Sequence, residues 1–433
     1  MDPVTVGVIA NIFFFLLLFI GVPVAFSLAL TGFFGTCWLV SPEVAFGLLT
    51  RDIFTQFSSY PLAAILFFVL MGYYVSAAGI SKKLYDTFYV LFGRLRGGLC
   101  VATIGACAGF AAICGSSVAT AATMGKLALP EMKKRNYENA LACGCVTAGG
   151  TLGPLIPPSN VFIIYGILTE QSIGKLFISG IIPGLIMTAL LVLTVVLICY
   201  FKPASGPPGD ETTWKAKLRA LGGMLEVVAL FTLVMVGLVA GWFVPSQAGA
   251  IGVVGALVIG LIRGMTWKRF IEETKEGIQT AASVLLLITG AVIYGHFMAL
   301  TEIPLIMIDW VQKARLSPVL ILGVIIVFYF MGGCLMDSLG FVVLTVPIIF
   351  PLITSAGIDP IWFGVIIVIL TEVGTLTPPV GVNVYVVHQI APEVPLETVF
   401  KGAIYFLPAM LICIGILILF PQVALFLPGL LMK

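Results

Sequence analysis

The chain repeats itself, and each copy interrupts an apolar segment with a small polar tip. The first copy runs from Cys114 to Pro130 and the second from Cys334 to Pro351. An offset of 221 residues pairs Ser116 with Asp337, Ser117 with Ser338, Pro130 with Pro351, and Pro157-Pro158 with Pro378-Pro379. Matching interruptions in two halves of a membrane protein predict a site where the halves meet, as in secondary transporters.

Composition places this repeat in a lipid bilayer. Of 433 residues, 60% are hydrophobic and 10% are charged, against roughly 25% charged residues in a soluble domain. Apolar runs of about 20 residues recur along the chain, long enough to span a membrane. The net charge of +2 is too small to suggest nucleic-acid binding. The nine cysteines lack CxxC spacing, so we interpret them as small core residues rather than metal ligands or disulfides.

We expect an all-α polytopic membrane protein with an inverted repeat. Each half has about five transmembrane helices, one of them broken, and one re-entrant hairpin, and the odd number of crossings inverts the second copy. The first repeat, 1–200, comprises scaffold helices at 4–78, an interfacial arm at 81–95, a hairpin at 97–130, a broken helix at 139–167 and a helix at 174–200. A Pro- and Gly-rich cytoplasmic linker follows at 201–216. The second repeat, 217–433, comprises scaffold helices at 219–264, an arm at 266–279, a helix at 280–299, a hairpin at 317–351, a broken helix at 361–390 and a helix at 398–420.

The distribution of basic residues predicts the orientation. If both termini lie outside, 17 of the 22 lysines and arginines face the cytoplasm. The five on the outside are Arg51, Lys175, Lys313, Arg315 and Lys433. This split satisfies the positive-inside rule. The two arms could also be ordinary cytoplasmic loops.

The hairpin tips are the first candidate sites. Non-helical chain at membrane depth persists only where protein or a water-filled cavity satisfies its backbone. Gly115-Ser116-Ser117 and Gly332-Gly333-Cys334 with Asp337-Ser338 fit that description. Small residues let the backbone turn, and freed carbonyls with hydroxyls suit a hard cation such as sodium. The alternative is a contact between helices packed through small residues.

A broken span follows each hairpin. Gly149 to Asn160 resembles Gly374 to Asn383, although the spacing between Gly-Thr-Leu and Pro-Pro is three residues longer in the first copy. Paired prolines end a helix and leave carbonyls free. The polar side chains of these segments are Thr151, Asn160, Thr375, Thr377 and Asn383. The simplest geometry puts one cation between each tip and the following break; the alternative is that the prolines only shape the bundle.

Few ionisable residues lie inside the apolar segments, and each is a candidate because burying it is costly. Asp337 at the second tip could neutralise a cation. Glu372 could do the same or pair with a basic residue. Glu226 is expected to pair with a partner or face an interface. His296 and His388 are more typical of packing than of a proton relay. Candidate substrate contacts are Ser116, Ser159, Asn160, Ser338, Asn383 and His296.

At this point the sequence resembles a known family. The stretch Gly149 to Phe177, which includes Gly-Thr-Leu-Gly-Pro-Leu-Ile-Pro-Pro-Ser, is similar to the large membrane subunit (DctM/SiaM type) of tripartite ATP-independent periplasmic (TRAP) transporters. The first tip, Gly115 to Thr120, and Gly374 to Pro379 match as well. The resemblance covers nearly the whole chain.

The resemblance implies a function that composition does not show. Such subunits work with a small four-helix membrane subunit and a periplasmic substrate-binding protein in the bacterial inner membrane. They import sialic acids, C4-dicarboxylates or similar acids with sodium by an elevator movement, in a fold like that of the ion transporter superfamily. Because the chain begins almost at once with a large-subunit span, a separate small subunit is expected.

Carried over by position, the resemblance also implies the sodium ligands, with two or more ions expected. The first ion would lie near Gly115, Ser116, Ser117, Gly150 and Pro154. The second would lie near Gly333, Cys334, Asp337, Gly374, Thr375 and Thr377.

Three other functions remain open. A proton-coupled anion carrier would use Asp337 and Glu372. An ion channel would also need polar re-entrant loops, but its filter usually comes from symmetric subunits. A membrane-embedded enzyme has no supporting HExxH or Ser/His/Asp pattern in the sequence, so we expect a transporter rather than an enzyme.

Overall fold

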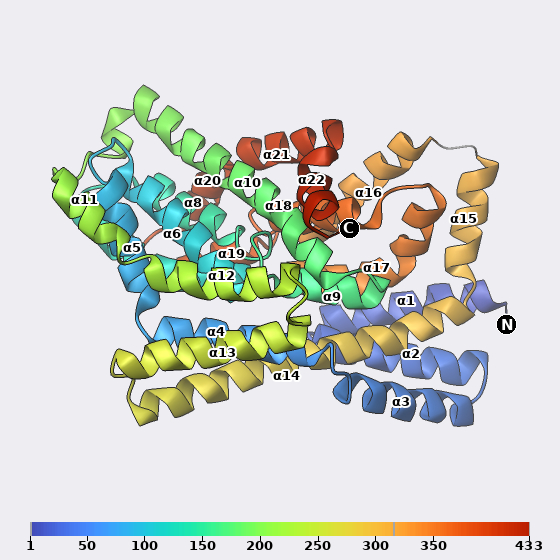
Figure 1. Cartoon of the computed structure of the whole chain (residues 1–433). Helices are drawn as coiled ribbons and strands as arrows, with labels where there is room; N and C mark the ends of the chain where they lie inside the picture. The colour runs from blue at the N-terminus through green and yellow to red at the C-terminus, as the bar shows by residue number, and fades with distance from the viewer. Residues whose placement is uncertain (1, 315–316, 433) are drawn as a thin grey trace.

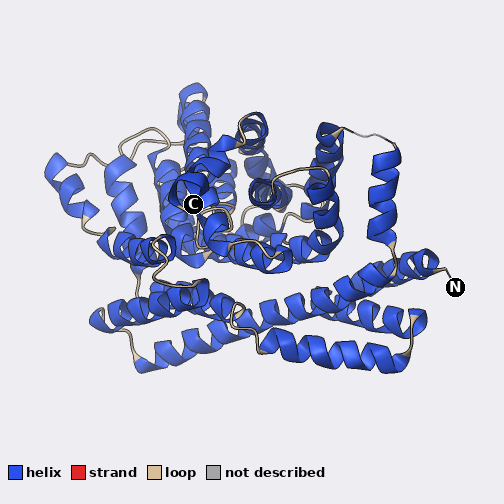
Figure 2. Ribbon diagram, turned by 45° about the vertical axis from the view of Figure 1, so that its right-hand side comes forward, coloured by secondary structure: helices blue, strands red, loops and turns tan. Residues whose placement is uncertain are grey.

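The computed structural model describes residues 2–314 and 317–432, and every regular element in these ranges is helical (Figure 2). The expected all-α class is therefore confirmed. Two basic residues assigned to the outside, Arg315 and Lys433, lie outside the described residues.

The helices of the first half follow the expected order, with one addition. They are α1 (Pro3–Phe19), α2 (Val24–Leu39), α3 (Pro42–Phe57), α4 (Ala63–Ala77), α5 (Ile80–Phe92), α6 (Gly98–Cys114), α7 (Ser117–Lys134), α8 (Asn139–Gly150), α9 (Asn160–Thr169) and α10 (Ile173–Phe201). A short 3-10 helix, η1 (Pro203–Ser205), lies in the linker. Helix α3 is the addition: it was not expected as a separate helix, because Glu43, Arg51 and Asp52 interrupt its apolar character.

The second half repeats the helix order of the first. Its helices are α11 (Trp214–Leu221), α12 (Leu225–Val239), α13 (Pro245–Ile262), α14 (Trp267–Leu300), α15 (Ile303–Lys313), α16 (Pro318–Gly333), α17 (Ser338–Ser355), α18 (Pro360–Gly374), α19 (Val382–Ile390), α20 (Leu396–Ile404), α21 (Leu407–Leu419) and α22 (Gln422–Leu431). The chain enters the hairpin α6–α7 from the left of Figure 1 and the hairpin α16–α17 from the right. The two copies are thus inverted.

The second arm differs from the expectation. The arm at 266–279 and the span at 280–299 form one continuous helix, α14. The 221-residue offset relates the start of α14 to α3 and relates the first arm, α5, to α15. Helices α5 and α15 lie at opposite ends of the molecule, and both run across the direction of the long helices (Figure 1). By contrast, the segment at 398–420, which was expected as one helix, is divided into α20 and α21.

The three-residue mismatch between the two breaks has a structural origin. Helix α8 ends at Gly150, whereas α18 continues three residues beyond the equivalent position, to Gly374. The second break, at 375–381, is two residues shorter than the first, at 151–159, because α19 begins one residue after the position equivalent to the start of α9. Both proline pairs keep the offset of 221, and both contain a cis peptide bond.

The helices form two layers. Helices α1 to α4, α13 and α14 lie side by side in the lower layer of Figure 1, where α14 packs against both α2 and α4. Above them, the hairpins pack against the broken helices, with α7 on α8 and α16 on α18. The lower layer and α12 contain the segments expected as scaffold, at 4–78 and 219–264, together with α14, which was expected as an arm and a separate helix. The upper layer holds both tips and both breaks.

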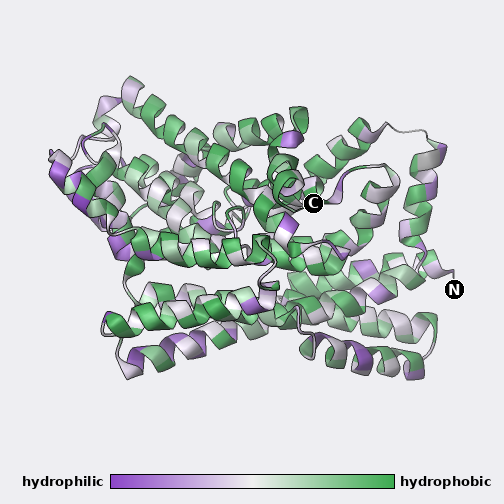
Figure 3. Cartoon of the chain, viewed as in Figure 1, coloured by the Kyte–Doolittle hydropathy of each residue, from purple (hydrophilic) through white to green (hydrophobic). Residues whose placement is uncertain are grey.

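Six helical segments in the described ranges are long and apolar enough to cross a membrane, and the bent pair α4–α5 would be a seventh. Most helical residues are hydrophobic, and hydrophilic residues are concentrated toward the left end of the molecule, for example on α11 (Figure 3). The chain is therefore a multi-pass membrane protein.

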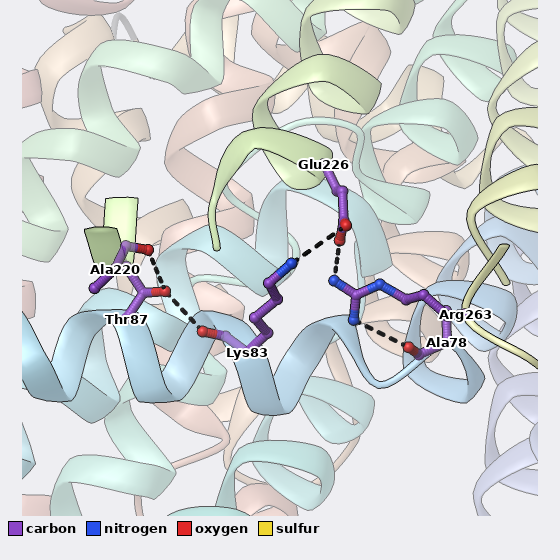
Figure 4. A network of polar contacts seen from close by, with 6 residues as sticks. All are labelled: Ala78, Lys83, Thr87, Ala220, Glu226 and Arg263. Carbon is purple, nitrogen blue, oxygen red and sulfur yellow. Dashed lines mark hydrogen bonds and ion pairs between the residues drawn. The ribbon is translucent and has the colours of Figure 1, made fainter. Parts of the chain in front are cut away.

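A polar cluster fixes the bend between α4 and α5. The two helices meet at 65°, and Gly79 occupies the left-handed region there, with φ +71°. Glu226 on α12 accepts a hydrogen bond from Lys83 of α5 at 3.3 Å and is also bonded to Arg263, at the end of α13 (Figure 4). Arg263 donates in turn to the carbonyl of Ala78 at 3.3 Å. Glu226 therefore pairs with basic partners, which is one of the two roles expected for it from the sequence.

Candidate functional site

The first hairpin tip lies against the break that follows it. Gly115 takes a left-handed conformation, with φ +64°, and its carbonyl accepts a hydrogen bond from the amide of Asn160 at 3.4 Å. A Cβ at Gly115 would lie 2.5 Å from the carbonyl oxygen of Pro158, and one at Gly153 would lie 2.5 Å from the carbonyl carbon of Ser116. Only glycine permits this close approach of tip and break.

The second tip makes an equivalent contact. The carbonyl of Cys334 accepts a hydrogen bond from the amide of Val380 at 3.1 Å. A Cβ at Gly333 would lie 2.7 Å from the carbonyl oxygen of Thr371, and one at Gly374 would overlap the backbone of Gly333. Asp337 caps α17 by accepting from the amide of Gly340 at 3.2 Å. The tips and breaks that the sequence paired are thus in contact in both halves.

The remaining residues of the expected cation sites lie at these same junctions. Gly150 ends α8, and a Cβ there would lie 3.1 Å from the carbonyl oxygen of Ser117. Pro154 lies in the first break. Thr375 caps the end of α18, and Thr377 in the second break donates its hydroxyl to the carbonyl of Val373 at 2.8 Å. Each expected set therefore gathers around one tip.

Helix ends give each junction its electrostatic character. The C-termini of α6 and α8 meet at the first tip, and those of α16 and α18 meet at the second. The last carbonyls of a helix lack intrahelical partners and carry partial negative charge, which favours cations. Helices α7 and α9 begin beside the first tip, capped by Ser116 and Ser159. Their N-termini favour anions.

A cavity of about 660 Å³ reaches the first tip. Most of its lining residues come from α7, α4 and α14, and the others come from α5, α6, α9 and α17. Ser116 and Asn160 line it, and the amide oxygen of Asn160 is buried without a hydrogen-bond partner. These are two of the candidate substrate contacts. The cavity extends to charged residues that the sequence analysis did not single out, namely Lys82, Lys126, Arg269, Glu273 and Glu276.

The missed cavity residues carry a recognisable pattern on α7. Ser116, Ala119, Thr123 and Lys126 recur every three or four residues, so they share one face of the helix. This periodicity could have extended the candidate site from the tip to Lys126. Arg269, Glu273 and Glu276 also recur every three or four residues and share one face of α14, but their relation to the tip arises only when α14 packs against α4.

The other candidate substrate contacts do not line the cavity. Ser159 is fully buried and its hydroxyl accepts from the amide of Phe162 at 3.2 Å. Ser338 donates to Glu372, and Asn383 donates to the hydroxyl of Thr375 at 3.4 Å. His296 lies in the scaffold, where its ring Nδ1 is 2.8 Å from the Asp52 carboxylate. The structure therefore gives His296 a partner other than a solute in this cavity.

Comparison with known proteins identifies the family. Residues 11–423 match the model of the tripartite ATP-independent periplasmic transporter, DctM component. The chain is 34% identical to the C4-dicarboxylate TRAP transporter large permease protein DctM of Pseudomonas aeruginosa, covering 93% of this chain and 94% of the relative. It is 31% identical to the sialic acid TRAP transporter large permease protein SiaM of Vibrio cholerae, over 96% of each chain.

A solved structure supports the fold. The Alcanivorax borkumensis YdaH transporter, whose crystal structure revealed an unusual topology, superposes with a TM-score of 0.63 over 88% of this chain and 90% of that one, at 15% identity. The sequence relatives are named as transporter permeases and not as enzymes. The chain belongs to the DctM family of tripartite ATP-independent periplasmic transporter components.

Proposed function

We propose that the chain imports a carboxylate-bearing solute, of the sialic acid or C4-dicarboxylate class, together with sodium. The observation that carries this proposal is the arrangement of helix ends. The cavity reaches Ser116 and Asn160, where the N-termini of α7 and α9 favour an anion. The carbonyl ends of α6 and α8 meet at the same tip and favour a cation. Broken helices of transporters divide anion and cation between their ends in this way.

Two sodium ions provide enough driving force for an anionic solute. One sodium ion that enters down a tenfold gradient and ~100 mV releases roughly 3.7 kcal/mol. Two ions release ~7 kcal/mol, and a monoanion that enters against the potential takes back ~2.3 kcal/mol. The remaining ~5 kcal/mol supports substantial accumulation, whereas a single ion would leave only ~1.4 kcal/mol. The two tip junctions provide one site for each ion.

The position of the cavity supports an elevator movement. The cavity is lined by upper-layer helices, chiefly α7, and by α4 and α14 of the lower layer. Movement of the upper layer against the scaffold would carry a solute at Ser116 across the membrane. We propose that the chain acts in the bacterial inner membrane with both termini in the periplasm. Its partners would be a small four-helix TRAP subunit and a periplasmic substrate-binding protein that delivers the solute.

Uptake into proteoliposomes tests the proposal. Vesicles would hold this chain and its small partner, with labelled organic acids outside and with sodium and the binding protein each added or withheld. We expect uptake only when both are present. Asn160→Ala should lower uptake at low solute concentration by about tenfold, because a hydrogen bond to a charged group is worth roughly 1.5–3 kcal/mol. Asn139→Ala is the matched control, since Asn139 also begins a helix but lies outside the cavity.

Uptake that is driven by a pH gradient and does not depend on sodium would instead support a proton-coupled carrier. Glu372 favours that second function, because its carboxylate is 1% exposed and surrounded by hydroxyl groups. Conductance that does not saturate with solute concentration would point to a channel.

A further inference from the structure

Helix α11, which joins the linker to the second half, presents an apolar stripe that the rest of the chain does not cover. None of its eight residues is buried. Trp214, Leu218 and Leu221 recur every three or four residues, so they share one face of the helix, and they are 73%, 57% and 43% exposed. Ala220 lies on another face, and its carbonyl is 3.1 Å from the Thr87 hydroxyl of α5. The stripe is therefore turned away from the protein.

Basic side chains flank this stripe on both sides. With about 3.6 residues per helical turn, Lys215 and Arg219 lie on one side of the stripe and Lys217 lies on the other. Helix α11 contains no acidic residue. No ion pair between described residues includes any of these three basic side chains. Long basic side chains beside an apolar stripe are typical of helices that lie at a membrane surface.

The length of the adjoining span places α11 at the boundary of the bilayer. Helix α12 has 15 residues, which at about 1.5 Å per residue extend ~22 Å, less than the ~30 Å of bilayer hydrocarbon. Trp214–Val239 together form an apolar span of 26 residues, and its length of ~39 Å exceeds that thickness. The additional length belongs to α11. Its stripe therefore reaches the boundary between hydrocarbon and headgroups, where tryptophan is enriched.

We propose that α11 is a lipid-binding helix that recognises anionic phospholipid headgroups through Lys215, Lys217 and Arg219. The apolar stripe contacts acyl chains, and the basic side chains contact headgroup phosphates. Helix α11 packs against α5, which packs against the hairpin helix α6, and α11 and α5 lie at the same end of the molecule (Figure 1). A bound lipid thus holds the first arm at the membrane surface. The lipid site requires neither sodium nor a particular solute, so it is independent of the proposed function.

Native mass spectrometry of the purified permease tests this lipid site. Dioleoylphosphatidylglycerol is the anionic probe, and dioleoylphosphatidylcholine is the zwitterionic one. A basic residue near an anionic surface strengthens binding by up to about fivefold. The double variant Lys215→Gln with Arg219→Gln should therefore bind the anionic lipid about tenfold more weakly and the zwitterionic lipid unchanged. The control, Lys133→Gln with Lys134→Gln, removes the same charge from side chains that are paired with acidic residues, and it should bind both lipids as the unmodified chain does.

Hydrogen exchange then locates the bound lipid. In nanodiscs, phosphatidylglycerol should slow exchange of the amides in 214–221 severalfold relative to phosphatidylcholine, and Lys215→Gln with Arg219→Gln should abolish the difference. Equal exchange of the unmodified chain in the two lipids, or equal affinity of the two double variants for the anionic lipid, would overturn headgroup recognition. Protection of α11 by the small subunit in both lipids would assign the stripe to a protein interface and would also overturn the lipid site.

Discussion

Gly333 and Gly374 bring two helix ends closer together than residues with a Cβ allow. A Cβ at Gly374 would overlap the backbone of Gly333 and lie 2.6 Å from the amide nitrogen of Cys334. Because the obstructing atoms belong to the backbone, rotation of a side chain cannot relieve the overlap. This contact holds the carbonyl ends of α16 and α18 together, and the proposed second cation site depends on it.

Gly374→Ala should therefore separate the second tip from its break. We expect destabilisation of roughly 1–3 kcal/mol, as for other overpacked sites, and loss of part of the rise in Tm that sodium binding should cause. Gly415→Ala is the control, because a Cβ in that part of α21 meets no atom within 4 Å. Alanine in a helix interior should leave stability unchanged or raise it by up to about 1 kcal/mol. Equal behaviour of the two variants would show that the close contact is not required.

At the scale of elements, the cluster around Glu226 fastens the first arm to the scaffold. Glu226 and Arg263 belong to α12 and α13, whereas Lys83 belongs to α5. Thr87 adds a second link, since its hydroxyl lies 3.1 Å from the carbonyl of Ala220 (Figure 4). The first half of α5 is thus held to α11, α12 and α13, and α5 also packs along α6.

Glu226→Gln should loosen α5 without disturbing the tips. The side chains of Glu226 and Arg263 are 30% and 20% exposed, so solvent screens the pair and we expect a loss of only about 1 kcal/mol. Hydrogen exchange measured by mass spectrometry should show faster exchange of the amides in 80–87. The control Glu272→Gln removes an exposed partner of Lys268 within α14 and should not change exchange in α5. Unchanged exchange in the Glu226→Gln variant would argue against a fastening role.

The sequence was most informative about elements that carry glycine, proline and repeated spacing. Both hairpins and both breaks were located because these residues restrict the backbone whatever surrounds them. Helix α3 was not separated from its surroundings, since a helix with polar residues on an exposed face resembles a loop in hydropathy alone. The hydrogen bond from Ser338 to Glu372 depends on how α17 packs against α18, which no local pattern records.

At the scale of the whole molecule, charge and cavity give a consistent orientation. The positive-inside rule predicts that Lys268 faces the cytoplasm and that Lys175 faces the periplasm. The cavity extends from the first tip to Lys82, Lys126 and Arg269, all assigned to the cytoplasmic side. In this orientation, the structure holds the first tip open toward the cytoplasm, which is the side where an imported solute is released.

Labelling of introduced cysteines tests this orientation. Eight of the nine native cysteines are buried and Cys37 is half-buried, so a Cys37→Ser background should react little. In intact spheroplasts, a membrane-impermeant maleimide should label Lys175→Cys and leave Lys268→Cys unlabelled until the membrane is permeabilised. Thr123→Cys in the cavity should react in inside-out vesicles and be protected by the solute. The reverse pattern at Lys175 and Lys268 would show that the orientation in the membrane is inverted. The cavity would then face the side on which the solute is received rather than released.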